Sequence, residues 1–150
     1  MLAYSLEDSL LKGKVEVKQL FDFIDKNAKL MDAYEMELGI YQWIQKIGLA
    51  AMQGYFAKKG TGDIGDVLDL DGIVLKKENT LRTRDYFSVF GKFPVPRTCY
   101  RKQGHTGVMP LDAEANLPER TYSYLLQEWM NILGIHDSFS EASTERLIGI

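Results

Sequence analysis

Residues 81–102 hold most of the basic side chains outside the predicted N-terminal helices, and basic side chains can bind a charged polymer. Six side chains of this stretch are cationic and one, Asp85, is anionic, so the stretch carries a formal charge of 6 − 1 = +5. The whole chain carries −3, and the residues outside the stretch therefore sum to −3 − 5 = −8. A basic island within an acidic chain indicates a binding surface better than the mean charge does.

Guanidinium and ammonium groups neutralise phosphates, and aromatic rings stack on bases. The stretch therefore predicts contact with nucleic acid through six cations and two tyrosines: Arg82, Arg84, Tyr86, Lys92, Arg97, Tyr100, Arg101 and Lys102. Two plainer explanations stay open from the residues alone. The charges could simply keep a strand face in water, and the aromatic side chains, Phe90 included, could face the core.

The remaining reactive side chains form no convincing catalytic set. Cys99 would need a nearby histidine to act as a nucleophile, and it stands among apolar neighbours in a predicted strand, which favours an inert buried thiol. One cysteine with His105 and His136 gives no zinc spacing. Asp112 and Glu114 could form a carboxylate pair, but without a third ligand we expect a turn leading into a helix.

Residues 67–78 imitate part of a calcium loop. Asp69, Asp71, Gly72 and Glu78 fall at the expected offsets, but the first ligand position is Val67, which offers no side-chain oxygen. No exiting helix follows Glu78. We therefore expect an acidic, solvated turn, and we predict no metal, no cofactor and no catalytic residue.

These residues must be positioned by a fold that we predict to be α+β. Residues 1–60 form a helical segment: a short turn or helix capped by Ser5, a helix over residues 15–29, and a long helix over residues 32–59 capped by Asp32. The predicted apolar faces are Val17, Leu20, Phe21 and Ile24 on the first of these two helices, and Ile40, Ile44, Ile47, Ala51 and Tyr55, widened by Tyr41, Gly48 and Met52, on the second.

Residues 61–116 are predicted to form an acidic loop followed by a small antiparallel β-hairpin or meander. The loop covers residues 60–71, and a short strand follows at residues 73–75. Residues 81–90 and 93–101 form two extended arms joined at Phe90-Gly91-Lys92. Pro94 and Pro96 cannot donate to a ladder, so we expect the return arm to pair on one side there, and residues 108–109 to add a short strand.

Residues 117–150 change to helical periodicity. We predict a helix from Leu117 to Gly134, and a second helix over residues 139–148 opened by a capping box at Ser138. This C-terminal helical pair would be the start of a truncated helix-turn-helix. The hydrophobic content of 45% suits a globular chain, and the single cysteine excludes an intrachain disulfide. No apolar run is long enough to span a membrane, and no signal pattern is present, so a cytoplasmic location is expected.

Three motifs resemble the N-terminal region of bacterial insertion-sequence transposases of the Kra type. They are R-x-R-D-Y-x-S-x-F-G-K-x-P-V-x-R at residues 82–97, C-Y-R-K at residues 99–102, and P-L-D-A-E-x-N-L-P at residues 110–118. The long helices before them and S-F-S-E-A at residues 138–142 are also similar. The resemblance covers most of the chain and is strongest from residue 81 to residue 143.

The resemblance implies a parent enzyme that cuts and joins DNA with an RNase-H-like domain, acidic residues and divalent metal. Nothing in these 150 residues matches that domain, so no catalytic residue is carried over. We expect a non-catalytic region that binds transposon ends, in a bacterial cytoplasm beside the nucleoid. The alternative is a dimerisation or regulatory module of a truncated or domesticated transposase, without DNA contact. In either case the small residues Gly48, Ala50, Ala51 and Gly54 could let the long helices pair in a homo-oligomer.

Overall fold

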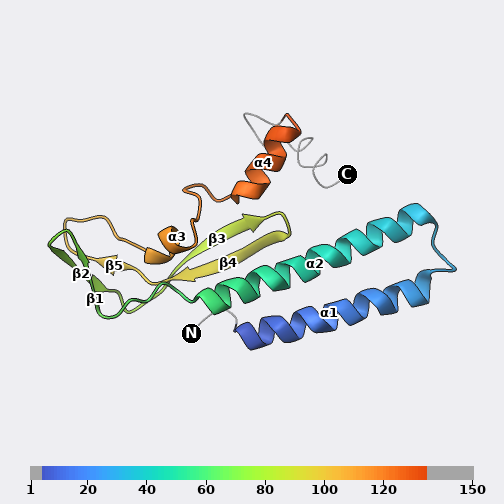
Figure 1. The fold of residues 1–150 in the computed structure, drawn as a ribbon, viewed down its shortest axis with the longest axis horizontal. Coiled ribbons are helices and arrows are strands. Elements are labelled where there is room, and N and C mark those ends of the chain that lie inside the picture. The colour runs from blue at the N-terminus through green and yellow to red at the C-terminus, as the bar shows by residue number, and fades with distance from the viewer. Residues whose placement is uncertain (1–4, 135–150) are drawn as a thin grey trace.

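The computed structural model describes residues 5–134 and has an α+β architecture. Two long N-terminal helices, α1 (Leu6–Asn27) and α2 (Ala33–Lys59), pack side by side. Small antiparallel sheets follow, and the short helices α3 (Pro110–Glu114) and α4 (Tyr124–Ile132) come last (Figure 1). The predicted helix over residues 139–148 and its capping box at Ser138 lie outside the described residues.

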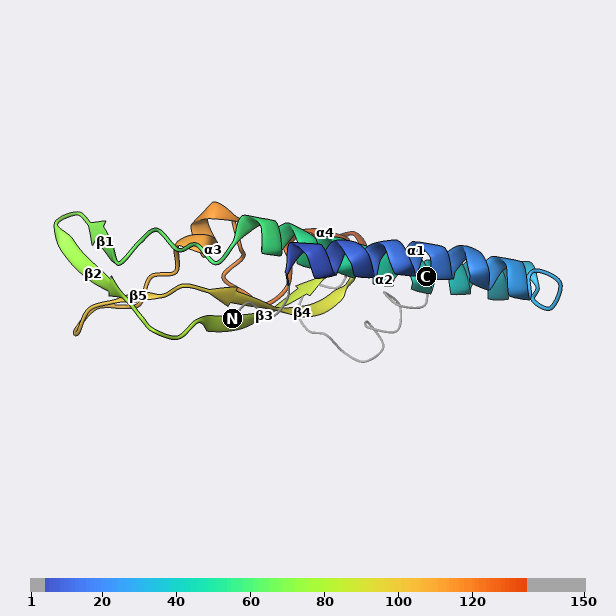
Figure 2. The ribbon, with the colours of Figure 1, turned by 90° about the horizontal axis from the view of Figure 1, so that it is seen from below.

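The molecule is elongated. The connection between α1 and α2 lies at one end, and the β1–β2 hairpin lies at the other (Figures 1 and 2). The β3–β4 hairpin covers the C-terminal half of α2, on the side opposite to α1 (Figure 1). None of the helices in the described part of the chain is long and apolar enough to cross a bilayer.

Helix α1 is a single helix from Leu6, so the predicted break before residue 15 is wrong. Ser5 caps it as expected, because its Oγ accepts a hydrogen bond from the Asp8 N–H at 3.0 Å. Gly13, which weakens an isolated helix, stands inside α1 where a Cβ would be 3.8 Å from the Cβ of Ala50. Close packing against α2 therefore keeps the helix continuous through this glycine.

The face of α1 that contacts α2 differs from the predicted apolar face. Its less exposed positions recur at alternating steps of four and three residues: Ser9, Gly13, Glu16, Leu20, Phe23 and Asn27. Leu20 is buried as expected, but Val17 and Phe21 are 40% and 64% exposed. The helices approach along the row that contains Ser9 and Gly13, because these small side chains allow the two backbones to come closer than the larger side chains of the neighbouring row would.

Helix α2 begins and ends as predicted. The Asp32 side chain accepts a hydrogen bond from the Glu35 N–H at 2.8 Å, and Gly60 ends the helix with a φ of 83°. The predicted stripe is wrong in part, because Tyr41, Ile44, Ala51 and Tyr55 are exposed. Ala50, Gly54 and Phe56 are buried instead, because two partners, α1 and the β3–β4 hairpin, cover α2 from opposite sides.

The acidic stretch after α2 contains a strand that the sequence analysis missed. Strand β1 (Val67–Leu70) pairs with β2 (Ile73–Lys77), and β2 also pairs with β5 (Tyr100–Arg101). Leu70 pairs with Ile73, so Asp71 and Gly72 form a two-residue turn with φ values of 52° and 86°. Positive φ at both positions is the geometry of a type I′ hairpin turn, which Asp-Gly favours.

Strands β3 (Arg82–Ser88) and β4 (Gly91–Arg97) form the predicted hairpin. The turn lies at Val89-Phe90 rather than at residues 90–92, because Ser88 pairs with Gly91. Phe90 packs against Gly48 of α2, where a Cβ would overlap its ring. The prediction that the proline-containing arm is paired on one side is confirmed: in the described residues β4 pairs with β3 alone.

The core lies where α2, the hairpin and α3 meet. It contains Phe56, Phe93, Val95 and Leu111, with Tyr86 packed against it. The rings of Phe56 and Phe93 lie 5.7 Å apart, and Tyr86 stands edge-on to both at 5.7 and 5.4 Å. Such aromatic contacts add to the free energy gained by burying the rings.

The segment after α2 is fixed to the end of β4. The Thr98 N–H donates to the Thr61 carbonyl at 2.8 Å, and the two threonine hydroxyls lie 2.7 Å apart. Gly62, with a φ of 78°, packs so closely that a Cβ would lie 2.6 Å from the Leu111 nitrogen. The base of α2 is therefore held by backbone and side-chain contacts at once.

The C-terminal half departs from the predicted helix over residues 117–134. Leu117 packs on the core, and residues 121–123 run beside β3, where the Phe87 N–H donates to the Thr121 carbonyl and the Ser123 N–H to the Phe87 carbonyl. Helix α4 begins after Ser123, whose Oγ accepts from the Leu126 N–H. These contacts outweigh the local helical periodicity. The short strand expected at residues 108–109 is an isolated bridge between Val108 and Tyr100.

Candidate nucleic-acid interface

The strand pairing gathers several cations where the two sheets meet. Arg82 pairs with Arg97 across the β3–β4 hairpin, and Lys76 pairs with Arg101 across β2 and β5. Lys102 follows Arg101 along the chain. We call these five cations, with the two carboxylates that the three arginines contact, the junction cluster: Lys76, Glu78, Arg82, Arg97, Arg101, Lys102 and Asp112. Its formal charge is 5 − 2 = +3.

Glu78 is the centre of this cluster. Both Arg82 nitrogens that face it donate to its carboxylate, at 2.9 and 3.1 Å, and the Arg101 Nε lies 3.4 Å away. The hydrogen bond from Arg82 holds the pKa of Glu78 below its ordinary value, with the charge of Arg101 acting in the same direction. One carboxylate thus faces two guanidinium groups, so one positive charge stays uncompensated at this point.

Arg97 has a structural role. Its Nη1 donates to both Asp112 oxygens, at 3.0 and 2.8 Å, and its side chain is 12% exposed. The pair ties β4 to α3. Asp112 is therefore committed to Arg97, which argues against the carboxylate pair considered for Asp112 and Glu114.

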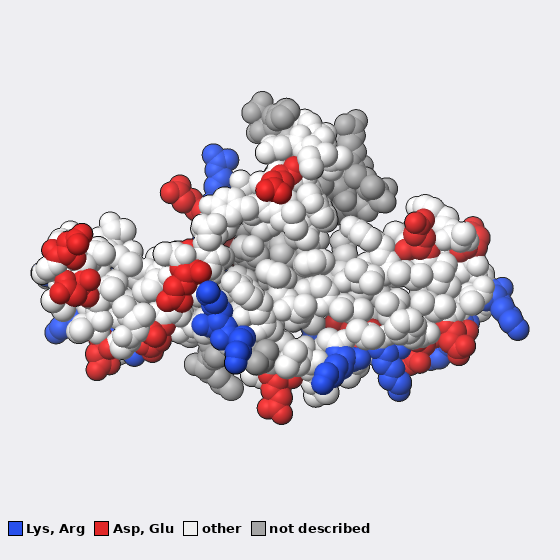
Figure 3. Space-filling model, in the orientation of Figure 1, with Lys and Arg blue, Asp and Glu red and all other residues white. Residues whose placement is uncertain are grey.

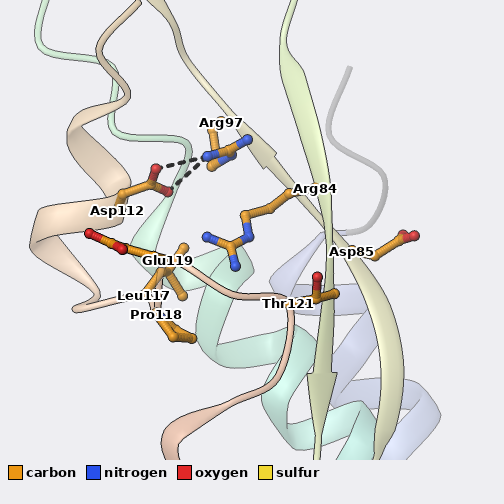
Figure 4. A pocket seen from close by; sticks show the side chains of 8 residues that line it. All are labelled: Arg84, Asp85, Arg97, Asp112, Leu117, Pro118, Glu119 and Thr121. Carbon is orange, nitrogen blue, oxygen red and sulfur yellow. Dashed lines mark hydrogen bonds and ion pairs between the residues drawn. The ribbon is translucent and has the colours of Figure 1, made fainter. Parts of the chain in front are cut away.

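Arg84 lies in an open cleft of about 610 Å³, which Arg97 and Asp112 of the junction cluster also line. Its side chain extends into the cleft and donates to the Arg120 carbonyl at 2.9 Å (Figure 4). The charged side chains that line the cleft are Arg84, Asp85, Arg97, Asp112 and Glu119, which sum to 2 − 3 = −1. This charge disfavours an anion in the cleft, so Arg84 is poorly placed to hold a phosphate.

Lys92 lies near the turn of the β3–β4 hairpin, at the end opposite to the junction cluster. Its Nζ is 3.4 Å from Asp85 and 5.6 Å from the Phe87 ring centroid. More than half of its side chain is exposed, so it can reach a ligand, but separately from the cluster.

The two tyrosines predicted to stack on bases are turned inward. Tyr100 is 0% exposed, and its hydroxyl donates to the Gly65 carbonyl at 2.7 Å and accepts from the Ile64 N–H at 2.9 Å. Tyr86 packs on Phe56 and Phe93, and burial raises its pKa. Neither ring can therefore act as a platform for a base in this structure. The sequence grouped both tyrosines with exposed arginines, but packing against distant segments buries their rings.

Cys99 is buried as the sequence suggested. Burial, followed by the nearby Glu78 charge, raises the pKa of its thiol, which disfavours the reactive thiolate. Within residues 5–134, histidine, cysteine and acidic side chains form no group of three that could hold a metal ion.

Sequence reasoning missed Lys76 and Glu78, which it placed in a turn. The β-favouring run Ile73-Val74-Leu75 marks the start of that strand, but no local signal extends it to Lys77. Figure 3 shows that positive and negative side chains are interspersed over one face of the whole molecule, so the junction cluster is a local excess of charge and no broad basic surface covers that face.

No protein-family model, no curated protein and no solved structure matches the chain. The likeness to Kra-type transposases therefore rests on the sequence alone. Its three motifs form the β3–β4 hairpin, β5 and α3, and they supply most of the junction cluster and, with Phe93, Val95 and Leu111, most of the core.

Proposed function

We propose that this chain is a non-catalytic region of an insertion-sequence transposase that holds DNA through the junction cluster. The observation that carries the proposal is the local excess of cations around Glu78, which pairs with both Arg82 and Arg101 while Lys76 and Lys102 lie next to Arg101 in the sheet and in the chain. Arg82 and Arg101 share Glu78, so a phosphate can replace one carboxylate contact without leaving the other guanidinium unpaired. The motif resemblance supports the same assignment, and DNA is the expected partner, with no cofactor.

Contact of this kind is electrostatic and reads no sequence by itself. Because Arg97 is committed to Asp112, we expect three or four neutralised phosphates, which give a slope of log affinity against log salt of about −2.7 to −3.6. Fluorescence anisotropy with a labelled duplex over a range of salt concentrations measures this slope. A slope near zero, or no binding at low salt, would contradict the proposal.

Three substitutions locate the contact. Arg82→Ala and Arg101→Ala should each weaken binding and reduce the slope by about one phosphate's share, ~0.9. Glu78→Gln should tighten binding, because it removes the carboxylate that competes with phosphate. Lys92→Ala is the matched control at the far end of the hairpin, and it should leave the affinity close to that of the unchanged chain. An effect of Lys92→Ala as large as that of Arg101→Ala would place the contact at the hairpin turn.

The second candidate is an assembly module without direct DNA contact. Exposed apolar side chains on both long helices favour it, among them Leu10, Phe21, Tyr34 and Ile44. If the salt titration detects no DNA binding while the chain self-associates, this second function is the one supported.

A further inference from the structure

We propose that α1 pairs with α1 of a second copy of this chain in an antiparallel arrangement. The surface is the outward row of α1, which repeats at steps of three and four residues: Leu10, Lys14, Val17, Phe21 and Ile24. It lies beside the row that contacts α2. The inference names the surface and geometry of the assembly function, and it does not depend on DNA contact.

Three of the four small residues expected to mediate assembly are not available for it, and Ala51 alone is exposed. Ala50 and Gly54 of α2 are buried, Ala50 lies opposite Gly13, and Gly48 receives the Phe90 ring. The outward row of α1 is different. Leu10 is 53% exposed and Phe21 is 64% exposed. Figure 2 views the molecule from the α1 side and shows no other helix or strand in front of α1.

The order of charges along α1 identifies the occupant as a second copy. Glu7 and Asp8 come first, then the cations Lys12, Lys14 and Lys18, then Asp22 and Asp25, and finally Lys26, with Lys29 just beyond the helix. Glu16, which stands among the first cations, lies on the row that contacts α2 and is left out of this order. The edge of the molecule over α1 in Figure 3 shows this alternation of red and blue. The end charges suit the helix dipole, but the middle blocks run against its direction, so the dipole does not explain them.

If the second α1 runs in the opposite direction, acidic blocks of one copy face basic blocks of the other. With the two-fold axis at Lys18, Glu7 of one copy faces Lys29 of the other, and Lys14 faces Asp22. In a parallel pair every block would face its own kind. Lys18, on the axis, is the exception because it faces Lys18 of the second copy, and its long flexible side chain can carry the ammonium group into water.

The charges are available for these contacts. In the described part of the chain, every ion pair lies between residues 63 and 112, and none involves a side chain of α1. At 1.5 Å per residue, the 22-residue helix presents a row about 33 Å long. The apolar residues supply the contact area, and the charge order sets the direction and register.

Light scattering over a dilution series of the 150-residue chain tests the association. The mass should rise with concentration from 17.1 kDa toward twice that value. Val17→Glu combined with Phe21→Glu should weaken the dimer about a hundredfold or more, with unchanged helical circular dichroism because both side chains are exposed. Tyr34→Glu is the control for general stickiness, since Tyr34 is 72% exposed on the other helix. A strict monomer, or equal effects of the two variants, would refute the proposal.

Disulfide cross-linking tests the direction of pairing. Lys14→Cys and Asp22→Cys should cross-link rapidly when mixed and poorly when each is oxidised alone, since a disulfide requires close Cα atoms. Cys99 is buried and does not compete. Self-cross-linking of each single variant would indicate a parallel pair and overturn the antiparallel assignment. These variants leave the junction cluster intact, so a failure here is separate from a failure to bind DNA.

Discussion

Asp63 fixes the start of the chain between α2 and β1. Its Oδ1 accepts from the Gly65 N–H at 2.9 Å, and its Oδ2 lies 3.0 Å from the Lys77 ammonium group. The Gly65 hydrogen bond, followed by Lys77, lowers the pKa of Asp63 below its ordinary 3.8. The same contact with Asp63 raises the pKa of Lys77.

Asp63→Asn should change how the free energy of unfolding depends on pH. A lowered pKa in the folded state gives a contribution that is fully present above pH 3.8 and is lost as the pH falls through the folded value. The unchanged chain should therefore lose more free energy of unfolding between pH 6 and pH 2 than the variant does. Urea unfolding across this range measures the difference. Parallel curves for the two proteins would show that the Asp63 contacts do not stabilise the fold.

For individual residues, the sequence predicts the contacts that depend on near neighbours in the chain. The caps at Ser5 and Asp32 need a partner three residues away, and both were predicted. The burial of Tyr100 and the pairing of Arg97 with Asp112 depend on segments 15 or more residues distant. Local alternation places Arg82 and Arg84 on one side of a strand, but it cannot say that Arg82 reaches Glu78 while Arg84 reaches the Arg120 carbonyl.

Among the elements, α2 contacts both α1 and the β3–β4 hairpin. Gly48 admits the Phe90 ring from one side, and Ala50 meets Gly13 of α1 from another. Sequence periodicity predicted the length of α2 correctly and its buried face only in part, because a helix covered on two sides has no single apolar stripe. Strand β1 was missed because its aspartates suggested a loop, although Asp71-Gly72 is a strong hairpin signal.

Gly48→Ala and Gly13→Ala should have opposite effects on stability. Alanine favours a helix over glycine by about 1 kcal/mol. At Gly13 the added methyl group fits, so the variant should be more stable by about 0.5–1 kcal/mol. At Gly48 the methyl group overlaps the Phe90 ring, and overpacking of about 1–3 kcal/mol should outweigh the gain. Chemical denaturation of both variants measures this. Stabilisation by Gly48→Ala would mean that Phe90 can leave this site freely.

In the whole molecule, one small core joins the helices to the sheets. Phe56 contacts the hairpin through Phe93 and Tyr86, and Leu111 brings α3 to the same point. The α+β class and the order of its parts were predictable from periodicity. The meeting point was not, since nothing local marks Phe56 as buried and Tyr55 as exposed.

Phe56→Ala should lower the free energy of unfolding by about 3–5 kcal/mol, as expected for a buried aromatic ring. Tyr55→Ala is the matched control. It removes a ring that touches Phe56 edge-on at 5.0 Å but is 46% exposed, so its cost should be nearer 1 kcal/mol. Thermal or urea unfolding followed by circular dichroism compares them. Equal losses would place the core elsewhere.

The attachment of Thr61 to Thr98 gives the molecule a mechanical property. Helix α2 has 27 residues and is therefore about 40 Å long, and it is anchored at its base. An anchored rod acts as a lever. A rotation of the sheets by about 10° would carry the far end of α2 through about 7 Å, given that length. A ligand that tilts the base of α2 would therefore displace its far end, and a force on the far end would exert a torque on the base.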